Sequence, residues 1–589
     1  MPIAKKTIFN LNTLFRLSFI LSFVGVFVFI LDFGYNKDVW IQIAIKGFYF
    51  CAITLGLAAT LIRYFILKRP IESKVLTIDI ITGVFCIAVI LVNFFSELFN
   101  KTPFLFYGES WIRFAFVLTF IREFSEQKLQ YKRATLNPAQ LFIISFIAII
   151  LLGALLLQLP NATHNGISFL DALFTSTSAV CVTGLIVVDT GSYFTEFGQV
   201  IIMFLIQIGG LGILTFASYF SYFFKGGSSY ENQLSIGEMT NSDKLGEVFS
   251  TLKRILIITF IIEFIGALMI FTSLDSRLIG SFFERVYFSA FHAVSAFCNA
   301  GFSTLQLGLY DDGFKYNYFL QLALIFLFVM GGLGFPIVVN LVKFTKYFIT
   351  VRVLQFKKRV KNHKPWVLTL NSRITLITTI TLTVVGTILF FFAEYDNSLA
   401  EHGAFGKFVT ALFGATTPRT AGFNTVDMAN LNFSTVILII LLMWIGASPA
   451  STGGGIKTST FAIATLNFIS LAKGKTRIEV YRREIADISV RRAFAVISLS
   501  LIVIGTGIII MSIFDSEKDL LGIAFECFSA YSTVGLSVGI TADLSSVSKF
   551  VIIVVMFIGR VSMLSIMIAV FRKVKHKNYR YPSEEITIN

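Results

Sequence analysis

Ser178-Ala-Val-Cys-Val-Thr-Gly184 is the first of four copies of one pattern, in which an apolar run and a hydroxyl residue precede a glycine by six positions. The other copies are Ser295-Ala-Phe-Cys-Asn-Ala-Gly301, Thr416-Thr-Pro-Arg-Thr-Ala-Gly422 and Ser529-Ala-Tyr-Ser-Thr-Val-Gly535. Successive glycines lie 117, 121 and 113 residues apart, and such a near-constant period indicates repeated structural units. Four equivalent backbone elements can surround one axis, as the carbonyl rings of selective cation pores do.

The composition is typical of an integral membrane protein. Of 589 residues, 55% are hydrophobic and 14% are charged, whereas about a quarter are charged in soluble chains. The net charge is +15, but the basic residues lie in short loops between apolar segments, where they direct membrane topology. We therefore expect a lipid bilayer around the chain and no nucleic-acid partner. The five cysteines have no metal-ligand spacing, so neither a zinc site nor a disulfide framework is expected.

Residues 1–135 are predicted to form an N-terminal extension with about four transmembrane helices. Apolar segments near 12–32, 39–62, 75–98 and 109–123 have lengths that approach or reach the width of the hydrocarbon core. The loops at 63–74 and 123–133 are rich in Lys and Arg, which places them and the N-terminus in the cytoplasm. The first apolar segment has no small-residue cleavage site, so we expect an uncleaved span.

Each of the four repeats is predicted to contain a long helix, a short re-entrant helix that ends at the glycine, and a second long helix. The first helices are expected near 139–159, 254–274, 373–394 and 493–514, and the second near 198–222, 317–343, 431–458 and 546–570. The segments between them, near 169–180, 286–297, 406–417 and 520–531, are too short to span a bilayer. The fold class is therefore an all-α polytopic membrane protein with four pseudo-repeats around a central pore.

The repeats are assigned to residues 136–225, 226–345, 346–475 and 476–570, followed by a basic cytoplasmic tail at 571–589. The connections after repeats two and three are also basic, and the positive-inside rule places them in the cytoplasm. The re-entrant helices therefore enter from the outside, and both chain termini are cytoplasmic.

The residues around each glycine are predicted to form an ion filter. Irregular backbone at membrane depth must be buried or line a wet cavity, and glycine permits a turn of successive carbonyls toward an axis. Around a cation these carbonyl oxygens replace the hydration shell. The predicted filter residues are Val182, Thr183, Gly184, Asn299, Ala300, Gly301, Thr420, Ala421, Gly422, Thr533, Val534 and Gly535. The hydroxyl residue six positions before each glycine is expected to hydrogen-bond the turn.

Several segments of the sequence resemble one family of transporters. Residues 178–191, 417–425 and 446–458, together with Met556-Phe-Ile-Gly-Arg560 and Tyr579-Arg-Tyr-Pro, are similar to the Trk/Ktr/HKT potassium transporters, most of all to the bacterial KtrB-type membrane subunit. The resemblance covers about residues 136–589 and leaves 1–135 outside the usual pattern. It implies K+ held at the filter carbonyls, and Gly184 argues for potassium because sodium-preferring plant members have serine there.

A gate is predicted in the second helix of repeat three. Proline and glycines make a continuous helix across 446–455 improbable, and the irregular backbone must face the water pathway. The resemblance implies an intramembrane loop that blocks the pore, with Arg560 beside it as an electrostatic barrier. A rigid kink that only accommodates packing is the alternative. The predicted gate residues are Gly446, Ser448, Pro449, Gly453, Gly454, Gly455, Lys457 and Arg560.

Four further charged residues lie near these segments. Glu263 and Glu526 are expected to stabilise arginines or backbone N–H groups, with direct ion contact as the weaker interpretation. Asp189 either attracts cations or caps a turn. Arg419 lies three residues before Gly422 and is expected to point away from the axis.

The predicted function is gated potassium uptake across the bacterial plasma (inner) membrane, driven by membrane potential, with sodium dependence left open. No P-loop motif occurs, so an enzyme is not expected and no organic cofactor is implied. The resemblance implies a homodimer and a cytosolic nucleotide-binding (RCK-type) regulatory subunit. The alternatives are a voltage-gated-like cation channel, a sodium-transporting member of the superfamily, or a membrane redox enzyme. The 109–123 segment supplies only Arg113 and Arg122 as sensor charges, and the histidines are scattered.

Overall fold

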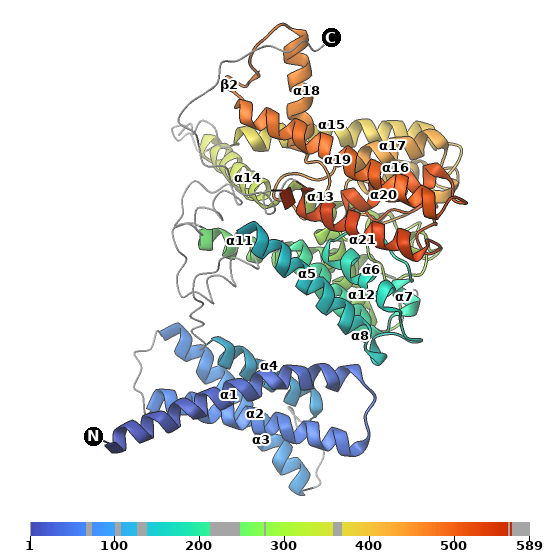
Figure 1. The fold of residues 1–589 in the computed structure, drawn as a ribbon. Helices are drawn as coiled ribbons and strands as arrows, with labels where there is room; N and C mark the ends of the chain where they lie inside the picture. Colours follow the sequence, from blue (N-terminus) through green and yellow to red (C-terminus); the bar gives the residue numbers. More distant parts are fainter. Residues whose placement is uncertain are drawn as a thin grey trace.

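The computed structural model describes residues 2–65, 73–99, 108–125, 138–212, 248–275, 279–356, 368–563 and 566–567. This part of the chain is almost entirely helical. Its single sheet is a two-stranded hairpin of β1 (Glu479–Val480) and β2 (Arg483–Glu484), with Glu479 opposite Glu484. The predicted all-α fold class is therefore confirmed (Figure 1).

The N-terminal extension forms a bundle of four helices. These are α1 (Pro2–Gly34), α2 (Val39–Phe65), α3 (Ser73–Phe99) and α4 (Glu109–Ser125), at the positions predicted from the apolar segments. Their shared core includes Tyr49, Ile53, Val89, Ile112 and Phe116. The bundle, drawn in blue in Figure 1, lies beside the first repeat, drawn in cyan.

Contacts at the end of α1 join the bundle to the rest of the chain. The Asn161 side chain, in the short helix η1 (Pro160–Ala162), donates to the Phe33 carbonyl at 2.9 Å. The Phe33 ring also stacks on Phe197, with centroids 5.8 Å apart. The bundle is therefore anchored next to the first repeat's second helix.

The charges of this bundle are paired. Arg63 binds both carboxylate oxygens of Glu123 at 2.9 and 2.8 Å, and both side chains are buried. Charges at this depth are costly unless they are paired, so each pair joins two helices at a fixed register. Further pairs among the described residues are Arg122 with Asp79, Arg113 with both Asp32 and Glu109, and Lys37 with Asp32.

The four repeats contain helices close to the predicted positions. The long first helices are α5 (Pro138–Leu157), α11 (Val248–Ser273), α15 (Leu370–Ala393) and α19 (Asp487–Phe514). The short helices are α6 (Phe169–Val180), α12 (Phe282–Cys298), α16 (Ala404–Thr416) and α20 (Leu520–Ser532). The second helices comprise α8 (Glu196–Gly210), α13 (Tyr318–Leu333) with α14 (Phe335–Phe356), α17 (Phe433–Trp444) with α18 (Thr458–Ala472), and α21 (Ser546–Val561). Connections contain α7 (Thr190–Tyr193), η3 (Gly308–Tyr310) and η4 (Met428–Asn430).

Three predictions of a continuous second helix are wrong. The predicted helix at 317–343 is broken at Gly334, which has a φ of 80°, and α13 and α14 meet at 107°. The predicted helix at 546–570 is interrupted at Ser562, which has a φ of 72°. A left-handed residue cannot continue a right-handed helix, so both helices end there. The predicted helix at 198–222 also stops early, because α8 ends at Gly210 and Gly212 has a φ of 76°. Residues 213–222 lie outside the described residues.

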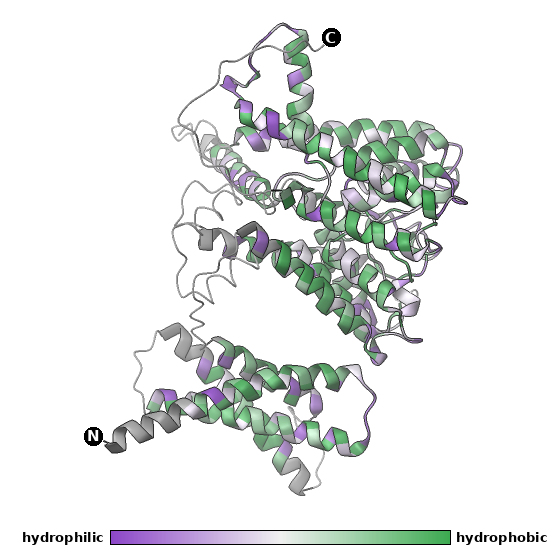
Figure 2. Cartoon of the chain, in the orientation of Figure 1, coloured by the Kyte–Doolittle hydropathy of each residue, from purple (hydrophilic) through white to green (hydrophobic). Residues whose placement is uncertain are grey.

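Five described helices are long and apolar enough to cross a membrane, and the bent α13–α14 pair is a sixth if it is one span. The five are Thr13–Gly34, Val39–Phe65, Lys253–Ser273, Leu370–Ala393 and Asp487–Phe514. Two predicted spans, α3 and α4, do not meet this length and hydropathy test over their described residues. Figure 2 shows hydrophobic residues along most of the helices and hydrophilic residues gathered at their ends and connections.

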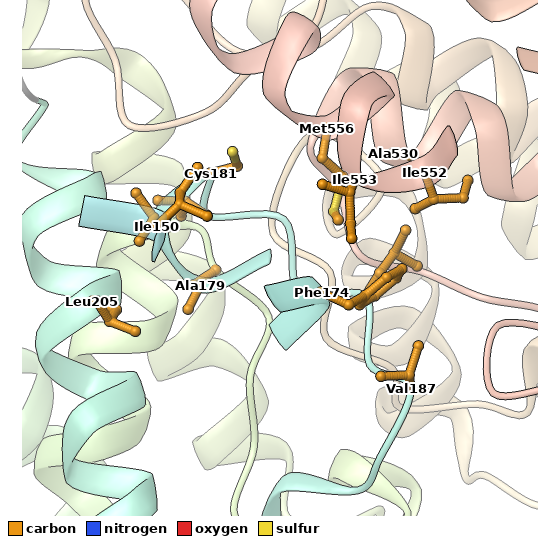
Figure 3. Packing of buried hydrophobic residues seen from close by; sticks show 14 of the residues in the cluster. Ile150, Phe174, Ala179, Cys181, Val187, Leu205, Ala530, Ile552, Ile553 and Met556 are labelled. Carbon is orange, nitrogen blue, oxygen red and sulfur yellow. The ribbon is translucent and has the colours of Figure 1, made fainter. Parts of the chain in front are cut away.

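The apolar core joins neighbouring repeats. One cluster combines residues of α6, such as Phe174, with Ile552, Ile553 and Met556 of α21, so that repeat four packs on repeat one (Figure 3). A second cluster joins α12 and α13 to Phe413 and Phe423 of repeat three, and a third joins repeat three to Phe525 of repeat four. Contacts between repeats therefore run around a closed circle.

Candidate ion pathway

The segment after each short helix makes the same unusual backbone turn. Two positions before the glycine, a residue takes a left-handed conformation, with φ of 58° at Val182, 61° at Asn299, 82° at Thr420 and 51° at Thr533. Such a φ is uncommon for a non-glycine residue and costly for a β-branched one. Its recurrence in four copies indicates that the site requires this backbone geometry.

The four glycines also have positive φ, and each lies against the next repeat. A Cβ added at Gly184 would stand 2.3 Å from the carbonyl oxygen of Ala300. The equivalent Cβ atoms would stand 2.9 Å from Ala421 O at Gly301, 2.0 Å from Val534 O at Gly422, and 2.1 Å from Thr183 O at Gly535. The contacts run from repeat one to two, three, four and back to one. The predicted filter glycines therefore form a closed ring, with no room for a side chain at Gly184, Gly422 or Gly535.

Hydroxyl groups hold the turns, although not identically. The Gly184 and Gly535 N–H groups donate to Ser178 and Ser529 at 3.0 and 3.1 Å, as predicted. In repeat two, Ser295 instead donates to the Phe302 carbonyl at 2.7 Å.

In repeat three, the hydroxyl of the predicted Thr416 does not hold the turn. It bonds to the Leu412 carbonyl within α16. Thr417 takes the holding role and donates to the Phe423 carbonyl at 2.6 Å. The anchoring hydroxyl therefore lies five positions before Gly422 and not six, which the alignment of hydroxyls on glycines missed.

The predicted break in repeat three is an irregular loop, residues 445–457, between α17 and α18. Its two ends are held together by a parallel bridge between Ile445 and Ile456. The Ser448 N–H donates to the Gly332 carbonyl at 2.9 Å, and the Pro449 carbonyl lies against Gly334. The loop is therefore seated on the break between α13 and α14.

The glycines of this loop allow close approach. A Cβ on Gly446 would stand 2.4 Å from the Gly454 carbonyl oxygen, and one on Gly453 would stand 2.2 Å from Thr420 Oγ1. Gly455 has a φ of 67° and lies near Ser532 of repeat four. The glycine-rich sequence thus lets the loop pack directly against the ring segments, which larger residues would prevent.

Both predicted gate cations contact the loop backbone. The Arg560 guanidinium, in the last turn of α21, donates to the Thr452 carbonyl and to the Gly209 carbonyl at the end of α8. Lys457 donates to the Gly453 carbonyl. Arg560 therefore joins the loop to repeats one and four, and within the described part of the chain no acidic side chain pairs with it.

The other charged residues have structural contacts. Glu526 accepts from the Ser537 and Thr541 hydroxyls, at 2.5 and 2.9 Å, and from the Val538 backbone, which fits the predicted backbone partner and not the predicted arginine. Glu263 accepts from Gln207 of α8 at 3.0 Å. Asp189 caps α7 by accepting from the Ser192 N–H at 2.7 Å, which favours the turn-capping interpretation.

Arg419 points toward α15. Its guanidinium donates to the Thr379 carbonyl at 3.2 Å and to Thr383 Oγ1 at 3.3 Å. It is thus turned from the ring, as predicted. The five cysteines are free thiols, and no group of three metal-ligating side chains lies within the described residues.

Sequence reasoning missed Thr452, which makes more contacts than several predicted gate residues. Its hydroxyl donates to Asn299 Oδ1 at 3.0 Å, its N–H donates to Gly331 O, and its carbonyl accepts from Arg560. A hydroxyl residue directly before a glycine triplet was the available signal, because such residues bond locally in irregular backbone.

A polytopic helical chain with a closed four-part backbone ring belongs to the class of multi-pass membrane transport proteins. This chain belongs to the TrkH family of cation transport proteins, whose family model matches residues 105–581.

Two relatives extend this result. The Ktr system potassium uptake protein B of Bacillus subtilis is 36% identical over 456 residues, which cover 76% of this chain and 96% of that protein. The potassium/sodium uptake protein NtpJ of Enterococcus hirae is 36% identical over 466 residues, which cover 77% and 98%. In fold, the chain resembles the crystal structure of the potassium transporter TrkH from Vibrio parahaemolyticus, with a TM-score of 0.59, 18% identity, and coverage of 84% and 97%.

Proposed function

We propose that this protein takes up potassium ions through the ring formed by Gly184, Gly301, Gly422 and Gly535. The observation that carries the proposal is a cycle of contacts. Each ring glycine lies against the backbone carbonyl of the residue that precedes the ring glycine of the next repeat. Carbonyl oxygens arranged in this way can replace the hydration shell of a monovalent cation. The names of the B. subtilis and E. hirae relatives, a potassium uptake protein and a potassium/sodium uptake protein, support the same assignment.

The driving force is the membrane potential, since 100 mV is worth about 2.3 kcal/mol for one charge. The proposal includes four repeats at 136–225, 226–345, 346–475 and 476–570, both termini in the cytoplasm, and the bacterial inner membrane as location. The 445–457 loop, latched by Arg560, serves as the gate. The working protein is a homodimer with a cytosolic nucleotide-binding subunit on its basic cytoplasmic loops.

Sodium transport is the second candidate, because NtpJ carries both ions in its name. The residue at position 184 distinguishes the potassium and sodium candidates. A serine there would bring a Cβ to 2.3 Å from Ala300 O at a φ of 88°, and would disturb the ring at one point. A voltage-gated channel is less well supported, since Arg113 and Arg122 of α4 are each paired with an acid.

The test is growth of a potassium-uptake-deficient bacterial host at low potassium, combined with rubidium and sodium uptake. The wild-type chain should restore growth, and Gly184→Ser should reduce the preference for potassium over sodium. Absence of any cation uptake by the wild type, when it is present in the membrane with its cytosolic partner, would refute the proposal. Unchanged preference in Gly184→Ser would refute the filter assignment.

A further inference from the structure

Three successive residues of the 445–457 loop lie against the left-handed residues of three different repeats. The Thr452 hydroxyl donates to Asn299 Oδ1 at 3.0 Å. Gly453 packs on Thr420, and a Cβ on this glycine would stand 2.2 Å from Thr420 Oγ1. The Gly454 N–H donates to Thr533 Oγ1 at 2.9 Å. Thr452, Gly453 and Gly454 therefore contact repeats two, three and four, respectively.

The groups it meets are oxygen atoms on one side of the ring. Asn299 Oδ1, Thr420 Oγ1 and Thr533 Oγ1 come from the residues two positions before Gly301, Gly422 and Gly535, and all three side chains are buried. Each oxygen accepts a hydrogen bond, since Thr420 Oγ1 accepts from Asn299 Nδ2 at 3.1 Å. Amide and hydroxyl oxygens are also the ligands that hard, monovalent cations accept.

We propose that these three oxygens form an inner cation site and that the closed loop covers it, with its own donors bound to Asn299 Oδ1 and Thr533 Oγ1 and with Gly453 packed against Thr420 Oγ1. This inference rests on the proposed potassium pathway. A hydrogen-bond donor and a potassium ion both require the same lone pairs, so the loop and the ion exclude one another. The loop is then a competitive inhibitor built into the chain: an ion that arrives through the ring must displace Thr452 and Gly454 before it can pass.

Competition makes a kinetic prediction that simple blockage does not. If the open state alone binds the ion, the apparent affinity is reduced by the fraction of protein that is open. A weaker closed loop therefore lowers the potassium concentration for half-maximal uptake and leaves the maximal rate unchanged. A plug that merely obstructs the path, without sharing ligands, would raise the maximal rate at an unchanged half-maximal concentration.

Thr452→Val tests this, because it removes the hydroxyl while the Thr452 carbonyl keeps its bond to Arg560. Uptake of potassium, traced with rubidium, is measured in proteoliposomes containing the full chain. We expect the half-maximal potassium concentration to fall about three- to tenfold, as one lost hydrogen bond implies. Thr465→Val is the matched control, since Thr465 lies outside the loop and its Oγ1 donates to the Phe461 carbonyl within α18 at 2.9 Å.

Asn299→Gly supplies the second arm. It breaks the same hydrogen bond but also removes an ion ligand, and glycine tolerates the φ of 61° at this position. We expect its half-maximal concentration to lie clearly above that of Thr452→Val. Equal values for these two variants, an equal fall in Thr465→Val, or a change confined to the maximal rate would each overturn the inner site. Absence of potassium uptake by the wild type would instead refute the proposed function.

Discussion

The Gly535 Cα lies so close to the Thr183 carbonyl that a Cβ on the glycine would stand 2.1 Å from that oxygen. Thr183 belongs to repeat one and Gly535 to repeat four, so their contact closes the ring between the last repeat and the first. Real Cβ atoms do not approach a backbone oxygen to this distance, so one of the two backbone segments would have to move. The contact is thus a sensitive point at which to test the ring.

Gly535→Ala should reduce potassium uptake by more than about tenfold, because the new methyl group displaces the Thr183 carbonyl at a φ that already disfavours alanine. Rubidium uptake at equal protein content in the membrane is the measurement. Gly505→Ala is the control, since nothing lies within 4 Å of a Cβ at this position in α19. Equal activity of both variants would contradict a functional ring at Gly535.

Arg560→Gln should increase basal potassium flux without the cytosolic partner by about tenfold, because charge-assisted hydrogen bonds to two carbonyls are lost. Flux from potassium-loaded proteoliposomes measures this. Arg560→Lys should be intermediate, as lysine keeps the charge but lacks the forked geometry. A flux at or below the wild-type level in Arg560→Gln would argue that this side chain does not hold the loop closed.

Glu123→Gln should destabilise the N-terminal bundle by about 3 kcal/mol or more, since it leaves the buried Arg63 without its counter-charge. Thermal unfolding of the purified protein in detergent is the readout. Glu109→Gln is the matched control, because Glu109 pairs with Arg113 but is 55% exposed, where such a pair is worth about 0–1 kcal/mol. Similar losses in the two variants would show that burial of the Arg63 pair has no special weight.

The connections that precede α13 and α16 contain a pair that responds to acid. The hydrogen bond from Lys315 Nζ, at 2.9 Å, holds the pKa of Glu401 below its ordinary value of 4.5. A lowered pKa means that the pair stabilises the folded state above about pH 4.5 and that this contribution is lost as pH falls through the folded pKa. The melting temperature of Glu401→Gln should therefore decrease less than that of the wild type as the pH falls below 4.5. Asp312→Asn should show the same decrease as the wild type, because the Asp312 side chain is 97% exposed.

The helices and the glycine ring could be predicted from sequence because both depend on local signals. Apolar run length determines a span, and glycine recurs where a side chain cannot fit, as at Gly422. The bend at Gly334 was missed although Gly331, Gly332 and Pro336 lie beside it, because glycines in an apolar run also serve ordinary helix packing and the loop seated on this break is not visible in the sequence. Thr452 and Thr417 were missed for a related reason. Their roles depend on partners 153 and 6 residues away, in geometry that only the assembled repeats define.

Because all four ring segments belong to one polypeptide, each quarter can change alone. Val182 has no side-chain oxygen at the position where the other repeats have Asn299, Thr420 and Thr533. A pore built from four identical subunits would have to repeat or lose such an oxygen in every quarter at once. Here a single mutation changes one of the four ring segments and leaves the other three unchanged, so natural selection can act on each segment separately.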